Sequence, residues 1–189
     1  MSTHDDLRDI ALNEFAVAGY AGTSLQRIAE IAGLSKSSVL YHFASKEALL
    51  EAAIGPAIDK MHAILDSVEG SLLVDDTRRV FVEQFVDFLL ANRLEVHMFI
   101  NQGPGLEDVP VIDRANALVL KLGEFFSSAV SSVEDKLRFG IALGGAAYVL
   151  SVRQDDSLEV LPVDEVRAAL ITIVSELLAP VSVRSTTKH

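Results

Sequence analysis

The fold is decided by residues 23–47, which read TSLQRIAEIAGLSKSSVLYHFASKE. Apolar residues recur at helical spacing before Gly33, and Val39 and Phe43 fall four residues apart, so the stretch predicts two short helices joined by a tight turn. Gly33 stands where a helix end needs a left-handed residue, and Ser35 is a natural N-cap for the second helix. This pattern predicts a helix-turn-helix, whose second helix enters the major groove of DNA.

The two ends of the motif carry further capping signals. Thr23 and Gln26 read as a T-x-x-Q capping box that opens the first helix. Ser45 is expected to cap a third helix, which places Lys46 in the first turn of that helix. Because a cation there opposes the helix dipole, we expect Lys46 to serve a function, as a contact to a DNA phosphate.

Residues outside the apolar stripes are the candidates for DNA contact. Small polar side chains at the start of the second helix allow close approach to the duplex, and the free backbone N–H groups there favour phosphate oxygens. We expect DNA contacts from Thr23, Ser24, Ser35, Lys36, Ser37, Ser38, Leu40, Tyr41, His42 and Lys46.

This part of the chain resembles the DNA-binding domain of the TetR/AcrR family of transcriptional regulators. An aromatic-rich end to a short recognition helix, followed by a capped Ser-Lys-Glu helix start, is more specific than a bare helix-turn-helix pattern. Ser37 and Leu40 depart from the family, whose members often carry Gly and Tyr there. The resemblance implies a two-fold dimer with a four-helix interface. The matching residues are Thr23, Ile28-Ala29, 32–36, 40–43 and 45–50.

Composition points to an all-α protein. The chain has 189 residues, 50% of them hydrophobic, with five prolines and a series of amphipathic segments. It has no cysteine, which excludes disulfides and thiolate metal sites. The first six residues lack the apolar core of a signal peptide, and the longest apolar run, 141–152, is shorter than the about 20 residues that a membrane span needs. We therefore expect a cytoplasmic protein that does not enter a membrane.

The net charge of −11 is the main objection to DNA binding. Residues 23–46 nevertheless carry Arg27, Lys36 and Lys46 against Glu30 alone, a local excess of two positive charges. Salt screens charges beyond about 8–10 Å, so a small basic face can act on an acidic body. We expect a shallower salt dependence than that of strongly basic DNA-binding proteins.

The chain is expected to divide into a helix-turn-helix domain and a helical body. Residues 1–50 form the first, residues 51–182 form an effector-binding and dimerisation domain, and residues 183–189 form a disordered tail. Gly55-Pro56 interrupts the linking helix, which predicts either a static kink or break needed for packing, or a hinge. The helices are expected at about 5–19, 46–68, 75–92, 96–100, 112–131, 133–153 and 163–178.

The helical body offers two candidate binding features. Its last two long helices are apolar over more than one face, so they pack either against a second subunit or centrally in a monomer. Aromatic and methionine side chains with a few polar groups suit an apolar ligand pocket, although such a stripe also suits an ordinary core. The candidate ligand contacts are Met61, Phe81, Phe85, Phe88, His97, Met98, Asn101 and Phe125.

Histidines do not predict a metal site in this chain. His62 and His97 have no third or fourth ligand at a recognisable spacing, and His4 and His189 fall in termini expected to be flexible. We therefore expect no metal and no cofactor.

Three functional classes follow from these patterns. The leading one is a ligand-responsive transcriptional regulator, usually a repressor, that binds a palindromic operator as a homodimer and is released by a small, mainly apolar effector. The alternative is a DNA-binding regulator whose helical body binds a protein partner. An enzyme is disfavoured, because the chain shows no nucleophile–base spacing, no HExxH motif and no phosphate loop.

Overall fold

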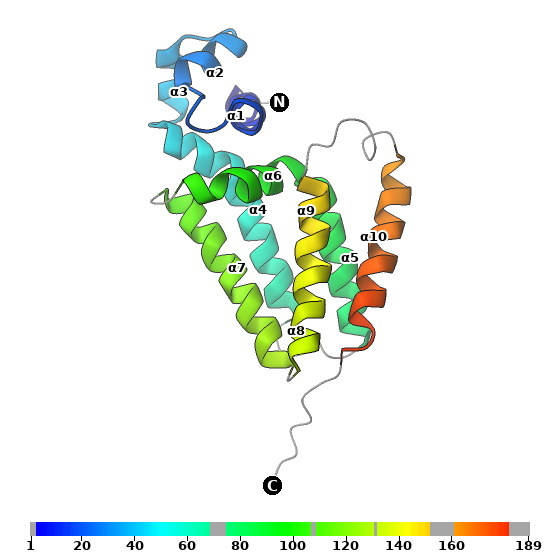
Figure 1. Ribbon diagram of the computed structural model, residues 1–189. Helices are drawn as coiled ribbons and strands as arrows, with labels where there is room; N and C mark the ends of the chain where they lie inside the picture. The colour runs from blue at the N-terminus through cyan, green and yellow to red at the C-terminus, as the bar shows by residue number, and fades with distance from the viewer. Residues whose placement is uncertain (1–2, 69–74, 107–108, 131, 152–160, 182–189) are drawn as a thin grey trace. The chain divides into compact units, whose positions relative to one another are not determined.

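The described part of the chain is helical. The computed structural model describes residues 3–68, 75–106, 109–130, 132–151 and 161–181, and these ranges contain no strand, which confirms the all-α prediction. Within them, no helix is long and apolar enough to cross a membrane. The helices (Figure 1) are α1 Thr3–Ala18, α2 Leu25–Ile31, α3 Lys36–His42, α4 Lys46–Val68, α5 Asp75–Ala91, α6 Arg93–Gln102, α7 Pro110–Ala129, α8 Val133–Phe139, α9 Gly145–Ser151 and α10 Val163–Leu178.

The chain divides into two compact units. The first comprises residues 1–59 and 94–116, and the second comprises residues 60–93 and 117–189. The first unit therefore joins α6 and the start of α7 to the N-terminal helices, a grouping that the sequence analysis did not anticipate. The predicted tail at 183–189 lies outside the described residues.

The N-terminal helices pack around a small apolar core in the first unit. Helix α2 contacts both α1 and α3. The side chains that they bury match the apolar stripes read from the sequence, because one face of each short helix must leave water for the unit to fold. The core is formed by Leu7, Ala11, Phe15, Ile28, Ala29, Val39, Phe43, Leu49 and Leu50.

The turn between α2 and α3 has the predicted form. Gly33 adopts φ +67°, the left-handed region that a residue without Cβ enters freely. Leu34 N–H donates to the Ala29 carbonyl at 2.8 Å and Gly33 N–H donates to the Glu30 carbonyl at 3.2 Å, which together make a Schellman motif. Ser35 then caps α3 by accepting a hydrogen bond from Ser38 N–H at 3.1 Å.

The capping box predicted at Thr23 and Gln26 is wrong. Ser24 is the N-cap of α2, with extended backbone angles and a side chain that accepts from Arg27 N–H at 3.1 Å. The hydroxyl of Thr23 is already used, because it donates to the Gly19 carbonyl at 2.8 Å. Gln26 reaches forward instead and donates to Glu30 within α2.

Helix α4 runs without a break through Gly55-Pro56. The predicted helix break is therefore wrong, and the static kink and the hinge stay predictions. Proline removes one backbone hydrogen bond, and Arg114 of α7 bridges this point by pairing with Glu51 and Asp59, one turn to either side of Gly55.

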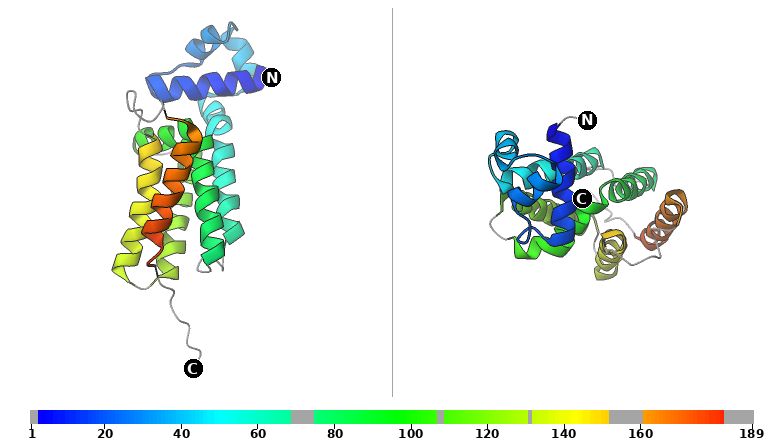
Figure 2. Two further views of the ribbon diagram at one scale, coloured as in Figure 1. Left: turned by 90° about the vertical axis from the view of Figure 1, so that its right-hand side faces the viewer. Right: turned by 90° about the horizontal axis from the view of Figure 1, so that it is seen from above.

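In the second unit, α5 packs against α10 and α9, and Figure 2 shows α5 and α10 running side by side. The helix predicted at 133–153 is continuous from Val133 to Ser151, with a π-helical turn at 140–144 between α8 and α9. Glycine is a weak helix former, and Gly140, Gly144 and Gly145 make the departure from regular geometry inexpensive. Residues 152 and 153 lie outside the described residues.

Candidate nucleic-acid interface

Helix α3 begins with a cluster of serine hydroxyls. Ser35 Oγ lies 2.8 Å from the hydroxyl oxygens of both Ser37 and Ser38. Lys36 and Ser37 are exposed, and Ser38 is half-buried. The hydroxyl protons can turn from one another toward an incoming acceptor, so this end of α3 offers several small donors beside the free backbone N–H groups.

The two faces of α3 differ sharply. Val39 and Phe43 are buried, whereas Leu40 is 42% exposed and Tyr41 is 87% exposed. Such exposure is unusual for a tyrosine, whose ring usually buries most of its apolar surface. Leu40 and Tyr41 are therefore available to a partner, as the sequence pattern predicted.

His42 and His4 lie at the end of this helix. The His4 ring is 4.4 Å from the Phe43 ring and 6.3 Å from the His42 ring, measured between centroids. The expectation that His4 belongs to a flexible terminus is wrong, because α1 begins at Thr3. Sequence reasoning missed His4 as a neighbour of α3, since only the tertiary fold joins residues so distant in the chain.

Thr23 and Lys46 serve the turn between α1 and α2. Thr23 is 2% exposed, and its hydroxyl contacts the Glu14 and Gly19 carbonyls. Lys46 Nζ donates to the Tyr20 carbonyl at 2.9 Å and to the Thr23 carbonyl at 3.1 Å. The Thr23 hydroxyl would have to leave these carbonyls to donate to DNA, whereas two of the three N–H groups of the Lys46 ammonium are engaged here.

The position of Lys46 also explains why a cation is tolerated at the start of α4. Its ammonium lies 4.1 Å from the centroid of the Tyr20 ring, a cation–π geometry that compensates the unfavourable helix dipole. The two carbonyls add further negative potential. This geometry supports a local structural role for Lys46 beside the phosphate contact predicted from the sequence.

Tyr20 and Glu47 form a second part of the same junction. The Tyr20 hydroxyl donates to Glu47 Oε1 at 3.3 Å, and burial first, then the Glu47 charge and this bond, raise the pKa of Tyr20 to about 12. Hydrogen bonds from its own backbone N–H and from Ser45 lower the pKa of Glu47. Ser45 caps α4 as predicted, by accepting from Ala48 N–H at 3.1 Å.

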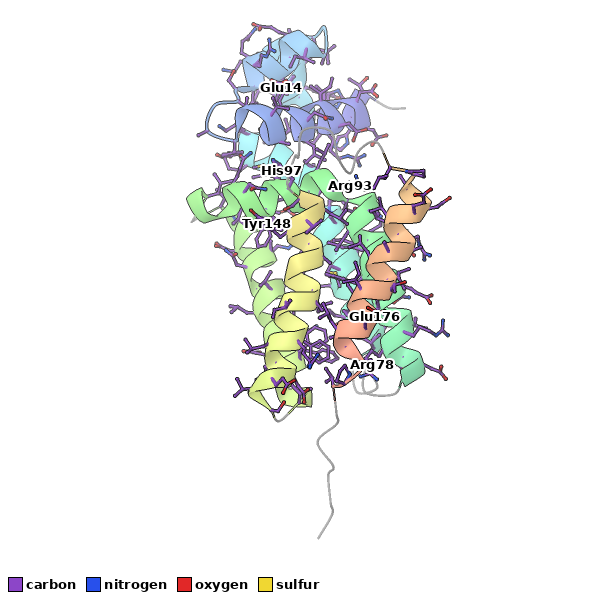
Figure 3. The ribbon with its side chains drawn as sticks, turned by 45° about the vertical axis from the view of Figure 1, so that its right-hand side comes forward. Glu14, Arg78, Arg93, His97, Tyr148 and Glu176 are labelled. Atoms are coloured by element: carbon purple, nitrogen blue, oxygen red, sulfur yellow. The ribbon has the colours of Figure 1, made fainter. Side chains whose placement is uncertain are left out.

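Two of the three cations in residues 23–46 are engaged within the fold. Arg27 pairs with Glu14 at 3.3 Å (Glu14 is labelled in Figure 3), and Lys46 is held by the turn. Lys36 remains exposed at the start of α3. A partner at this surface would therefore meet hydroxyl, aromatic and backbone groups more than cations.

The candidate ligand residues fall into both units. In the second unit, the Phe81 ring stacks on Phe85 at 5.8 Å, and the rings of Phe125 and Phe126 meet at 5.3 Å. Phe126 joins these groups, since it lies 5.7 Å from Phe81 and 4.4 Å from Phe139. Met61 is buried and Phe88 is half-buried there.

The remaining candidates belong to α6 in the first unit. Met98 is buried, His97 is half-buried, and Asn101 is exposed with its side chain bonded to the His97 carbonyl at 3.0 Å. Within the described residues, no three metal-ligating side chains gather.

The outer faces of α8, α9 and α10 expose apolar side chains. Ile141 is 62% exposed and Tyr148, labelled in Figure 3, is 59% exposed. Leu137 and Ile173 are also more than half exposed. Leu137 on α8, Ile141 in the π-helical turn, Tyr148 on α9 and Ile173 on α10 are together called the apolar face of α8, α9 and α10 below.

Comparison with known proteins agrees with this geometry. Residues 7–53 match the family described as bacterial regulatory proteins, tetR family. The chain is 32% identical over 119 residues to the HTH-type transcriptional regulator RutR of Escherichia coli K12, covering 58% of this chain and 56% of RutR. It is 27% identical over 116 residues to the HTH-type transcriptional repressor KstR2 of Mycolicibacterium smegmatis, covering 59% and 55%.

The chain thus spans about half the length of these curated relatives. The ketosteroid transcriptional regulator KstR2 of Mycobacterium tuberculosis shares the fold, with a TM-score of 0.70 and 16% identity over 97% of this chain and 96% of that one. These relatives are transcriptional regulators, not enzymes. Residues 7–53 of the chain thus match the tetR family of bacterial regulatory proteins, and the chain as a whole is similar to transcriptional regulators.

Proposed function

We propose that this protein is a homodimeric transcriptional repressor that binds a palindromic operator and is released by a small, mainly apolar effector. One observation carries the DNA-binding part of this proposal. Helix α3 buries Val39 and Phe43 while it exposes serine hydroxyls, Lys36 and Tyr41 on a rigidly capped scaffold. A recognition helix needs this combination of a fixed backbone and an exposed polar and aromatic face.

The exposed apolar face of α8, α9 and α10 supports a second copy of the chain as partner. A contiguous apolar surface in water favours association, and an isologous contact would place two α3 helices about a two-fold axis. Two such helices read two half-sites about 34–36 Å apart, which makes the operator palindromic.

The aromatic cluster of the second unit supports an apolar effector. Phe81, Phe85, Phe125, Phe126 and Phe139 supply a large apolar surface with polarizable faces. The solved structure with the similar fold is called a ketosteroid transcriptional regulator, and ketosteroids are largely apolar molecules. An effector can release DNA only by binding the two conformations with different affinity.

Selection of bound duplexes from random DNA tests the DNA-binding proposal. The wild-type chain should enrich a palindrome, and Tyr41→Ala and Ser37→Ala should alter the sequence preference at positions near α3. Leu120→Ala, on the exposed side of α7, is the matched control and should enrich the same palindrome. Enrichment of no sequence by the wild-type chain would refute the proposal.

A further inference from the structure

Helix α1 ends at a glycine turn that resembles the turn after α2. Gly19 adopts φ +81° and Gly33 adopts φ +67°, so both occupy the left-handed position that follows a helix. In a Schellman motif, the N–H of the residue after this glycine donates to the carbonyl four positions before the glycine. At Gly33 that bond is direct, from Leu34 N–H to the Ala29 carbonyl at 2.8 Å.

At Gly19 the corresponding groups are Tyr20 N–H and the Phe15 carbonyl, and a side chain from α6 lies between them. Tyr20 N–H donates to Gln102 Oε1 at 2.8 Å, and Gln102 Nε2 donates to the Phe15 carbonyl at 2.6 Å. Gln102 lies 82 and 87 residues away in sequence from these partners. Its amide carries one acceptor and two donors, so it reproduces the peptide groups that it separates.

The turn completed by Gln102 leads directly into the DNA-reading helices. Thr23 Oγ1 holds the Gly19 carbonyl, and Lys46 Nζ holds the Tyr20 carbonyl. Ser24, which follows Thr23, is the N-cap of α2. Only four residues therefore separate the peptide bound by Gln102 from the start of the helix-turn-helix.

We propose that Gln102 is a positioning residue for DNA binding, which completes the C-cap of α1 from α6 and so fixes the α1–α2 turn. The proposal rests on the DNA-binding function proposed above. Withdrawal of the amide lets Tyr20 N–H and the Phe15 carbonyl approach each other directly, as at Gly33. The end of α1 then closes, and the chain stays folded with an altered start of α2.

This alternative closure gives the proposal its test. Gln102→Met keeps the length of the side chain but cannot bridge the two backbone groups. We expect it to weaken binding to the duplex selected by the wild-type chain about tenfold, within the usual range of coupling between sites. Its Tm should stay within about 2 °C of the wild-type value, because the direct bond replaces the lost pair.

Gln84→Met is the matched control, since Gln84 is exposed on α5. It should bind the selected duplex as the wild-type chain does. Binding by Gln102→Met within twofold of wild type would overturn the proposal, and so would a loss of affinity that follows a lowered Tm.

Gln102→Glu separates positioning from simple loss of fold. A carboxylate can accept from Tyr20 N–H but repels the Phe15 carbonyl, whereas a protonated carboxyl group can bridge both. The affinity of this variant relative to wild type should therefore be about tenfold lower at pH 7.5 and should recover as the pH falls toward 4, through the ordinary glutamic acid pKa of about 4.3. Lys46 and Glu47, which contact the same turn, are common to both proteins and cancel in this ratio.

A loss of affinity in Gln102→Glu that is the same at both pH values would overturn the proposal. If the wild-type chain selected no duplex, the proposed function itself would fail and this inference with it. If the wild-type chain and the Gln102 variants bound DNA equally well, the role of Gln102 would be refuted and the proposed function would stand.

Discussion

At the scale of single residues, Lys46 has two possible roles, one in stabilising the fold and one in contacting DNA, and substitution can separate them. Its ammonium bonds the Tyr20 and Thr23 carbonyls and lies over the Tyr20 ring. Charge-assisted bonds of this kind contribute about 1.5–3 kcal/mol. We expect Lys46→Met to lower the free energy of unfolding by about 2 kcal/mol, measured by urea titration.

The salt dependence of DNA binding is the second readout for Lys46. A lost phosphate contact lowers the slope of log K against log salt by about one per subunit. We expect Lys46→Met to leave this slope unchanged and Lys36→Met to lower it. A lowered slope with unchanged stability in Lys46→Met would show that the lysine contacts DNA directly.

Tyr20 predicts an alkaline loss of stability. Its pKa is raised from 10.0 to about 12 in the folded chain, so folding favours the neutral phenol. This contribution is fully present below pH 10 and is lost as the pH rises from 10 to 12. In Tyr20→Phe the urea midpoint of unfolding should decrease less between pH 10 and pH 12 than in wild type. Tyr148→Phe, changed at an exposed site, should show the same decrease as wild type.

An absorbance titration checks the same assignment. Of the three tyrosines in the chain, one should ionise near pH 12, and that step should disappear in Tyr20→Phe. Persistence of the late step in this variant would assign it to another tyrosine.

At the scale of elements, α4 stays helical through its proline because of its neighbours. A Cβ at position 55 would lie 2.7 Å from Glu51 Oε1, and Glu51 is paired with Arg114. Arg114 also reaches Asp59 at 2.6 Å. Gly55 therefore provides the space in which an ion pair spans the missing backbone bond.

A double-mutant cycle tests this relation. Alanine is about 1 kcal/mol better than glycine in a helix interior, and an exposed ion pair contributes about 0.2–1 kcal/mol. Gly55→Ala should stabilise Arg114→Met by about 1 kcal/mol but should stabilise the wild-type chain less, because there it displaces the Glu51 carboxylate. Equal gains in both backgrounds, measured by chemical denaturation, would show that the pair and the glycine are independent.

The helix-turn-helix could be predicted because its signals are local. Gly33, Ser35 and Ser45 act within four residues of their partners, and their roles are as the pattern indicated. The capping box failed because Ser24 caps α2 and the Thr23 hydroxyl donates to the Gly19 carbonyl in the preceding turn. Lys46 and Gln102 depend on partners 23 to 87 residues away, and no spacing in one sequence reveals such partners.

At the scale of the whole molecule, the proposed binding to a palindromic operator requires a dimer. Ile141 is exposed on the apolar face of α8, α9 and α10, and a carboxylate there would be buried without a partner in the proposed interface. Ile141→Glu should therefore elute in light-scattering chromatography with the mass of one 20.4 kDa chain. Wild type and Leu120→Glu, changed on α7, should both show twice that mass.

The DNA-binding geometry is tested most directly by the spacing of the two half-sites. Two recognition helices on a rigid dimer match half-sites one helical turn apart, and five inserted base pairs rotate one half-site by about half a turn. We predict that this insertion weakens binding of the wild-type chain to its selected duplex by at least about 30-fold. Affinity within threefold of the uninterrupted duplex would contradict a dimer that reads two successive major grooves.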